Sequence, residues 1–401
     1  MKQLIKLSML ILLISSCSHD EGTEVIEQTT ADSIKKLDMN EVGNNYDQLV
    51  LDIQSNQDLD FIIGDFNLEM RNMRPAEGIT VENTIILEDE KDYRTIIIDH
   101  NTESIYVNYT DIDSKRNIVL YGFKHSDHLE NLLKQKEYNI EFLTNRTSYK
   151  NRSSKIAKLD YISTETSFLM GKPILTTKKE QSQARIHDDN TKECGFQESE
   201  ISDLAKESTI LNRSGKTWNV IIYKKHSYLS TSSIVYAMKN TFKSLSITDG
   251  SDWYYSHIMY ANINVIYEEA PKGFHNSDSL TCLNEFVKFL KDGGVQNNRS
   301  TNSYMYLNDD DWKSTFGRAS KSLFGFRVGV STNSGTTFAH EIGHTLGAKH
   351  YNGVVWDSSI GMFGWWGSSV MCPADETQWG VFRRHKYYSQ TNRNKVRSTL
   401  N

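Results

Sequence analysis

"TTFAHEIGHTLGAKH" occupies Thr336–His350 and places three histidines and one glutamate within eleven positions. His340 and His344 are four residues apart, a spacing that puts two imidazole rings on one face of a helix, one turn apart. Gly347 offers the left-handed conformation that ends many helices, so the chain can turn there and bring His350 back to the same point. The stretch therefore predicts a helix, a tight turn and three imidazoles that grip one ion.

Three histidine ligands leave the fourth position of a tetrahedral zinc ion to water, which is the arrangement of a catalytic zinc site. Glu341 follows the first ligand directly and is placed to take a proton from that water as general base. Zinc lowers the pKa of the water and polarises a carbonyl, and the glutamate can pass the proton to a leaving amine. Phe338, Ile342 and Leu346 are expected to face the core.

The pattern "HEIGHTLGAKH" resembles the metzincin clan of zinc metalloproteases, whose second mark is a methionine-containing turn beneath the metal. "SSVMCP" supplies Met371 after His350, in the order that the clan requires. Pro373 stands where some metzincins carry a tyrosine as an extra ligand, which favours three protein ligands. The resemblance implies an α+β fold with a mixed twisted sheet and an active-site helix, zinc as cofactor, and an endopeptidase acting on proteins or peptides.

Within the clan, the chain looks most like the adamalysin or reprolysin type. The signs are the strand and helix order before the motif, "VMCP" at the turn and a final helical stretch, "SQTNRNKVRSTL". Two features depart from that type. Tyr351 stands where adamalysins usually have aspartate, and a long segment carrying "GMFGWWG" separates His350 from Met371. The resemblance covers about Thr217–Leu400.

The first residues, "MKQLIKLSMLILLISSCSHDEG", combine a lysine-bearing start with an apolar run at Met9–Ile14 that is too short to span a bilayer. This pattern predicts an export signal. "ISSC" resembles the lipobox of bacterial lipoproteins, which implies cleavage before Cys17 and lipid attachment to its sulfur; an ordinary secretory signal is the alternative. We expect a lipoprotein at the cell envelope or surface, with a membrane anchor at its N-terminus.

Three cysteines remain after Cys17, an odd number for an exported protein. Cys194 lies in "TKECGFQ", which resembles the cysteine switch of adamalysin-type proenzymes. There it would ligate the zinc and block the position that water needs. A disulfide between Cys282 and Cys372 would then account for the other two. The alternatives are that Cys194 pairs with one of them or is simply exposed.

The 401 residues suggest at least two domains. Short β-type runs between residues 46 and 170 predict a mostly β prodomain: "QLVLDI", "DFIIGDF", "TIIIDH", "SIYVNY" and "NIVLYGF". A polar stretch follows, in which Lys206, Arg213 and Lys216 are candidate sites for an activating protease. The predicted organisation is signal peptide 1–16, lipidated tether 17–45, prodomain 46–170, linker with switch and activation site 171–216, and catalytic domain 217–401.

The second half alternates strands and helices. Strands are predicted in "TWNVIIYKK", "ANINVIYEEA", "SYMYLND" and "FGFRVGVS". Apolar residues at helical spacing predict one helix in "SSIVYAMKNTFKSLSI" and a second around Leu280–Leu290, with Asp278 near its start and Gly293 after its end. The alternation indicates a mixed α/β arrangement. A helix is also expected in "HLENLLKQKE" of the first half.

A net charge of −6 without a run of basic residues argues against nucleic acid as a partner. Two other functions compete with a latent protease. The chain could be a surface binding lipoprotein whose metzincin-like domain is not proteolytic, although Glu341 and all three histidines are present. Alternatively, the β-rich half could be a binding or targeting module rather than a propeptide.

Overall fold

The computed structural model describes residues 34–89, 94–111, 116–125, 138–142, 164–169, 172–178, 214–226, 231–246, 259–271, 274, 278–308, 317–332, 335–350, 354–357, 365–368, 370–371 and 388–401. Within the unit Lys35–Asn401, we call residues 35–178 the N-terminal half and residues 214–401 the C-terminal half. The helices described are α2 (Val42–Ser55), α5 (Ser232–Lys243), α6 (Ser279–Asp292), α7 (Gly335–Thr345) and α8 (Gln390–Leu400).

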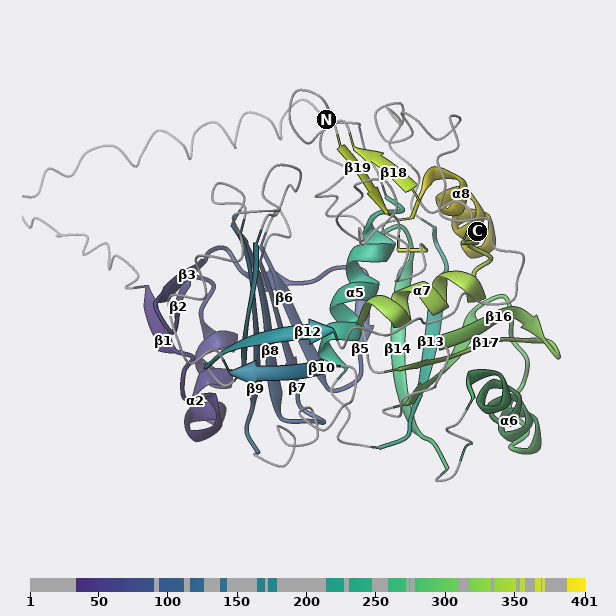
Figure 1. The fold of residues 1–401 in the computed structure, drawn as a ribbon, viewed down its shortest axis with the longest axis horizontal. Helices are drawn as coiled ribbons and strands as arrows, with labels where there is room; N and C mark the ends of the chain where they lie inside the picture. The colour runs from purple at the N-terminus through teal and green to yellow at the C-terminus, as the bar shows by residue number, and fades with distance from the viewer. Residues whose placement is uncertain are drawn as a thin grey trace, which may run out of the picture. The chain divides into compact units, whose positions relative to one another are not determined.

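The N-terminal half is built mainly from two sheets (Figure 1). The smaller has the order β1 (Lys35–Asp38), β2 (Leu59–Ile63), β3 (Phe66–Met70). The larger has the order β10-β12-β11-β9-β8-β7-β6-β4. Its strands are β4 (Arg74–Pro75), β6 (Thr84–Glu88), β7 (Arg94–Asp99), β8 (Ser104–Asp111), β9 (Arg116–Phe123), β10 (Tyr138–Phe142), β11 (Thr164–Leu169) and β12 (Lys172–Lys178).

The C-terminal half holds a six-stranded sheet with the order β16-β17-β15-β13-β14-β5. Five strands are parallel, and the edge strand β16 is antiparallel to β17. The strands are β5 (Ile79–Val81), β13 (Thr217–Lys224), β14 (Asn262–Glu269), β15 (Asn302–Asn308), β16 (Gly317–Leu323) and β17 (Phe326–Thr332). A separate hairpin pairs β18 (Val354–Asp357) with β19 (Trp365–Ser368).

Helices cover both faces of the six-stranded sheet. Val220 and Ile222 of β13 belong to a core shared with α5, α7 and α8, whereas Ile221 and Tyr223 face a second core with α6. Successive side chains of a strand point to opposite faces, so a strand buried on both faces is apolar at every position. This double burial explains the unbroken run "VIIY". The structure confirms the strands predicted in "TWNVIIYKK" and "ANINVIYEEA" and the helix predicted in "SSIVYAMKNTFKSLSI".

Helix α6 begins and ends where the sequence predicts. The carboxylate of Asp278 accepts hydrogen bonds from the backbone nitrogens of Leu280 and Thr281, at 3.2 and 2.9 Å. The hydroxyl of Thr281 donates a further bond to it at 2.6 Å. These bonds satisfy backbone donors that have no partner inside the helix. Gly293 caps the other end.

One predicted strand is wrong. "QLVLDI" lies inside helix α2, where Val42, Tyr46, then Leu49 or Val50, and Ile53 are buried at spacings of three or four positions. That helical period extends beyond the quoted run, so its upstream members are needed to see it. "DFIIGDF" is also not one strand, because Gly64, at φ 56°, turns β2 into β3.

The predicted boundary between residues 45 and 46 falls inside helix α2. Strand β1 and the start of α2 lie within the segment predicted as tether, and β12 lies within the segment predicted as linker. The helix expected in "HLENLLKQKE" lies outside the described residues. None of the described helices combines the length and apolar composition needed to cross a bilayer.

Candidate metal centre

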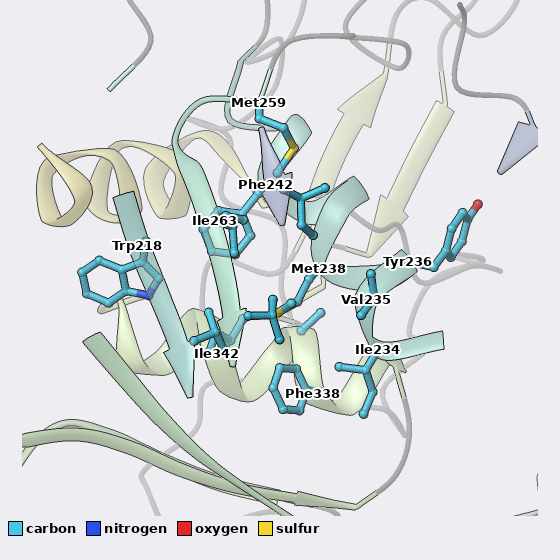
Figure 2. Close-up of a cluster of buried hydrophobic side chains, with 14 of the residues drawn as sticks. Trp218, Ile234, Val235, Tyr236, Met238, Phe242, Met259, Ile263, Phe338 and Ile342 are labelled. Carbon is cyan, nitrogen blue, oxygen red and sulfur yellow. The ribbon is translucent and has the colours of Figure 1, made fainter. Parts of the chain in front are cut away.

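Helix α7 orients two of the three histidines by burying its opposite side. Phe338 and Ile342 have no exposed surface and pack in the same cluster as Met238 of α5 (Figure 2). Burying an apolar side chain of this size contributes about 1.5–3 kcal/mol. Residues two positions along a helix point to the other side, so this burial fixes the direction of His340 and His344.

The helix ends at the glycine that the sequence predicts. Gly347 has φ 92°, a conformation that favours glycine. The backbone nitrogen of Ala348 donates to the carbonyl oxygen of Gly343 at 3.0 Å, and that of Gly347 donates to His344 at 3.0 Å. Together these two bonds form a Schellman motif. The chain reverses here, and His350 comes back towards the helix.

The three imidazoles converge on one point. The Nε2 atoms lie 3.1 Å apart for His340 and His344, 2.7 Å for His344 and His350, and 2.9 Å for His340 and His350. Ligands about 2.0–2.1 Å from a tetrahedral zinc ion lie about 3.3–3.4 Å from one another. The observed separations are slightly shorter than this, and the three residues are able to hold one metal ion.

Backbone carbonyls fix the tautomers of two of these rings. The Nδ1 atom of His340 lies 2.9 Å from the carbonyl oxygen of Val370, and that of His344 lies 2.9 Å from the carbonyl oxygen of Ala348. A carbonyl only accepts, so each Nδ1 must carry the proton. Each Nε2 then presents a lone pair to the other at 3.1 Å. Facing lone pairs repel unless a cation lies between them, so the donor set fits a bound metal ion.

Glu341 lies against the first residue of the edge strand β16. Its side chain is 5% exposed. A Cβ atom added at Gly317 would lie 2.5 Å from Cγ and 2.6 Å from Oε1 of Glu341, closer than any carbon can approach. Gly317 therefore leaves the space that the glutamate occupies. Nothing in the local sequence marks Gly317, because the contact depends on the path of β16.

Met371 packs against the middle of α7, at Gly343. A Cβ atom added at Gly343 would meet the sulfur of Met371 at 2.5 Å and the ring of Tyr388 at 2.9 Å. Met371 and Tyr388 have no exposed surface. This burial raises the pKa of the Tyr388 hydroxyl well above its usual value, so the phenol stays neutral. The residue before Met371 is Val370, whose carbonyl oxygen accepts a hydrogen bond from Nδ1 of His340, so this segment contacts the helix and orients one of the three histidines.

Helix α8 holds the backbone next to the third histidine. The side chain of Asn392 accepts from the nitrogen of Lys349 at 2.9 Å and donates to its carbonyl oxygen at 3.0 Å. Asn392 has no exposed surface. Its amide matches both backbone groups of the residue before His350. The sequence contains the helix but gives no sign that Asn392 is a positioning residue.

Several predicted residues lie elsewhere. Cys282 is buried in α6, within the core that α6 shares with the sheet. Cys17, Cys194, Cys372 and Pro373 lie outside the described residues, as do the candidate cleavage positions Lys206 and Arg213. The lipid anchor, the cysteine switch and the disulfide therefore stay predictions.

No protein-family model matches the chain, and no curated protein matches it in sequence. Among solved structures, it is similar to metalloproteinase-II from Bacteroides fragilis, with a TM-score of 0.51 and 15% identity. The match covers 91% of this chain and 98% of that one. A chaperone-substrate complex also matches, at a TM-score of 0.29 and 12% identity over 46% of this chain and 36% of that one, which carries no structural argument. The chain therefore shares the fold of this metalloproteinase.

Proposed function

We propose that this protein is a zinc-dependent endopeptidase of the metzincin type. The observation that carries the proposal is the convergence of the Nε2 atoms of His340, His344 and His350, two of them with their lone pairs directed at one another. The fold shared with a metalloproteinase supports the same reading. The order of β13, α5, β14 and α6 before α7, with the "VMCP" turn, is the basis for proposing the adamalysin type.

In this proposal each residue has one role. The three histidines hold zinc, which when bound lowers the pKa of a water molecule and polarises a substrate carbonyl. Glu341, one residue after the first ligand, takes the proton of the attacking water and delivers it to the leaving amine. Met371 supports α7 from below in the manner of a Met-turn.

We further propose that the chain is made as a latent lipoprotein precursor. Cys17 would carry the lipid, and Cys194 would ligate the zinc until a protease cuts at Lys206, Arg213 or Lys216. The cut would break the covalent link between the catalytic half and the membrane anchor. Replacing Cys194 by alanine should give an uncut chain that is active, and an uncut chain that is as inactive as before would argue against the switch.

The test of the proteolytic function is metal analysis followed by a peptide-library assay of the cut protein. We expect one zinc per chain and endopeptidase activity that Glu341→Gln lowers by about a hundredfold to ten-thousandfold, with zinc retained. Glu69→Gln is the matched control, because the Glu69 side chain is 59% exposed and lies in β3. Full activity in Glu341→Gln contradicts the mechanism. Zinc binding with no cleavage of any peptide favours a non-proteolytic binding lipoprotein.

A further inference from the structure

A buried ion cluster joins the two halves of the chain. Lys239 and Lys243 of α5 both approach Oε2 of Glu88, the last residue of β6, at 2.8 and 2.6 Å. The three side chains are 0%, 4% and 5% exposed. The Nζ atom of Lys239 also donates to the hydroxyl of Thr95 in β7 at 3.0 Å. Two cations from one half thus meet one carboxylate from the other, away from solvent.

A neutral hydrogen bond extends this cluster along α5. The hydroxyl of Tyr236 donates to the side-chain oxygen of Asn108 in β8 at 2.7 Å. Its ring lies 5.6 Å from that of Tyr106. In Figure 2, Tyr236 points away from Phe338 and Ile342, so α5 contacts α7 on one side and the N-terminal sheet on another. In all of these bonds α5 donates and the N-terminal sheet accepts, so the two surfaces are complementary.

A second contact lies at the edge of the C-terminal sheet. Strand β5 comes from the N-terminal half and pairs in parallel with β14, with Ile79 opposite Ile263 and Val81 opposite Val265. Two further backbone bonds flank the pair, from Ile263 to Gly78 at 2.8 Å and from Glu82 to Val265 at 3.3 Å. Adding a strand to an open edge is a common way for one polypeptide to bind another.

These contacts differ in what they contribute. The strand pairing and its apolar side chains favour association. In a separated half, water hydrates the charged groups of the ion cluster, and docking removes that hydration at a cost in free energy. The attraction between the lysines and the carboxylate offsets this cost only when both partners meet in the interface. A carboxylate missing from the assembled interface would leave two lysines buried without it. The cluster therefore makes docking of the halves selective for this one arrangement.

We propose that the N-terminal half is a noncovalent ligand of the C-terminal half, bound through α5 and the edge of β14, and that it stays bound after the connecting segment is cut. Its consequence for release from the membrane rests on the proposed precursor: scission alone does not release the catalytic half from the lipid anchor, and a second event must displace the N-terminal half from α5 to release it. The binding itself does not depend on proteolytic activity.

The test uses the full chain with Glu341→Gln in every sample, so that it cannot cut itself. A recognition site for a sequence-specific protease is inserted between residues 179 and 213, and the folded protein is cut there. We expect the two fragments to elute together in size-exclusion chromatography at micromolar concentration and to give a one-to-one complex in native mass spectrometry. Fragments that separate under these conditions overturn the proposal, whatever the outcome of the activity assay.

Substitutions in the ion cluster test whether it contributes to binding between the two fragments. Glu88→Gln should raise the dissociation constant of the fragments by about a hundredfold to a thousandfold, because it removes the buried carboxylate that both lysines approach. Glu69→Gln, at an exposed position, should leave it unchanged. If Glu88→Gln prevents folding of the whole chain, the triple variant Glu88→Leu, Lys239→Met, Lys243→Met serves instead and should bind within about tenfold of wild type. Equal binding by Glu88→Gln and Glu69→Gln rejects the role of the cluster. Loss of binding in the triple variant rejects the claim that the cluster contributes selectivity rather than affinity.

Discussion

The Nδ1 atom of His340 lies 2.9 Å from the carbonyl oxygen of Val370, the residue immediately before Met371. This bond fixes the proton of the ring on the side away from the other histidines. It joins helix α7, which carries His340 and His344, to the segment that holds Met371. Since the partner is a backbone carbonyl, substitution of Val370 cannot remove it. The bond must be tested through the proposed metal binding, which it would favour by orienting His340.

Zinc should stabilise the folded protein through these three rings. An ion that binds only the folded state adds about 2.7 kcal/mol to the free energy of unfolding at a hundred times its dissociation constant. We expect urea denaturation to show this gain on adding zinc and its loss on chelation. His344→Ala should abolish the gain, and His100→Ala, at an exposed position, should keep it. A gain that persists in His344→Ala would place the metal elsewhere.

Asn392→Asp should weaken zinc binding without removing a ligand. Aspartate keeps an oxygen near the nitrogen of Lys349 but turns lone pairs towards its carbonyl oxygen, which now receives a donated bond at 3.0 Å. Losing a group that orients a ligand typically costs about tenfold to hundredfold in metal affinity. Competition with a chromogenic chelator measures the affinity. Asn394→Asp is the control, since it makes the same charge change at an exposed position of α8. Equal affinities in the two variants would contradict the role of Asn392.

Gly317→Ala should lower catalysis while zinc stays bound. The new methyl group would lie 2.5–2.8 Å from the side chain of Glu341, so the carboxylate must move. A displacement of about 1 Å in an active site can cost about a hundredfold in rate. Gly215→Ala is the control, because no atom beyond the two neighbouring residues lies within 4 Å of its added methyl group. In a Glu341→Gln background, Gly317→Ala should have no further effect on kcat. A further loss there would mean that the methyl group acts on something other than Glu341.

Asp278→Ala should destabilise the protein by about 1 kcal/mol at pH 7, the usual cost of losing a helix N-cap. The hydrogen bond from the Thr281 side chain, followed by that from its backbone, lowers the pKa of the Asp278 carboxyl. A lowered carboxyl pKa stabilises the fold above the unfolded value near 4, and this stabilisation is lost as pH falls through the folded value. Urea denaturation at pH 7 and pH 3 should therefore show a difference in unfolding free energy between wild type and Asp278→Ala that is smaller at pH 3. Asp278→Asn keeps the cap without titrating. An equal difference in unfolding free energy at both pH values would show that the charge of the Asp278 carboxylate does not contribute to stability.

Local sequence was enough for most elements of the C-terminal half. The capping residue Asp278, the apolar spacing of α5 and the left-handed Gly347 act over a few residues, and the structure agrees with each of them. It was insufficient for "QLVLDI", where a strand-like composition lies in a helix. There the preference for strand was outweighed by burial of one helical face against the neighbouring sheet.

The lysines of α5 show where local pattern fails for physical reasons. A helix with one apolar face is expected to expose its lysines, yet Lys239 has no exposed surface. Its burial is offset by Glu88, 151 residues earlier in the chain. No spacing rule connects two positions so far apart, because the contact exists only once two sheets and a helix have been assembled.

The sequence by itself determined the convergence of the three histidines, the neighbouring glutamate and the turn that returns His350, since helical geometry and one glycine act within a single short segment. Tertiary structure decided how those groups are held. Three residues meet the site from elsewhere in the chain. Val370 lies 30 residues after His340, and Asn392 lies 43 residues after Lys349. Gly317 comes from the separate strand β16. Such contacts depend on how sheet and helices pack, so only the folded chain reveals them.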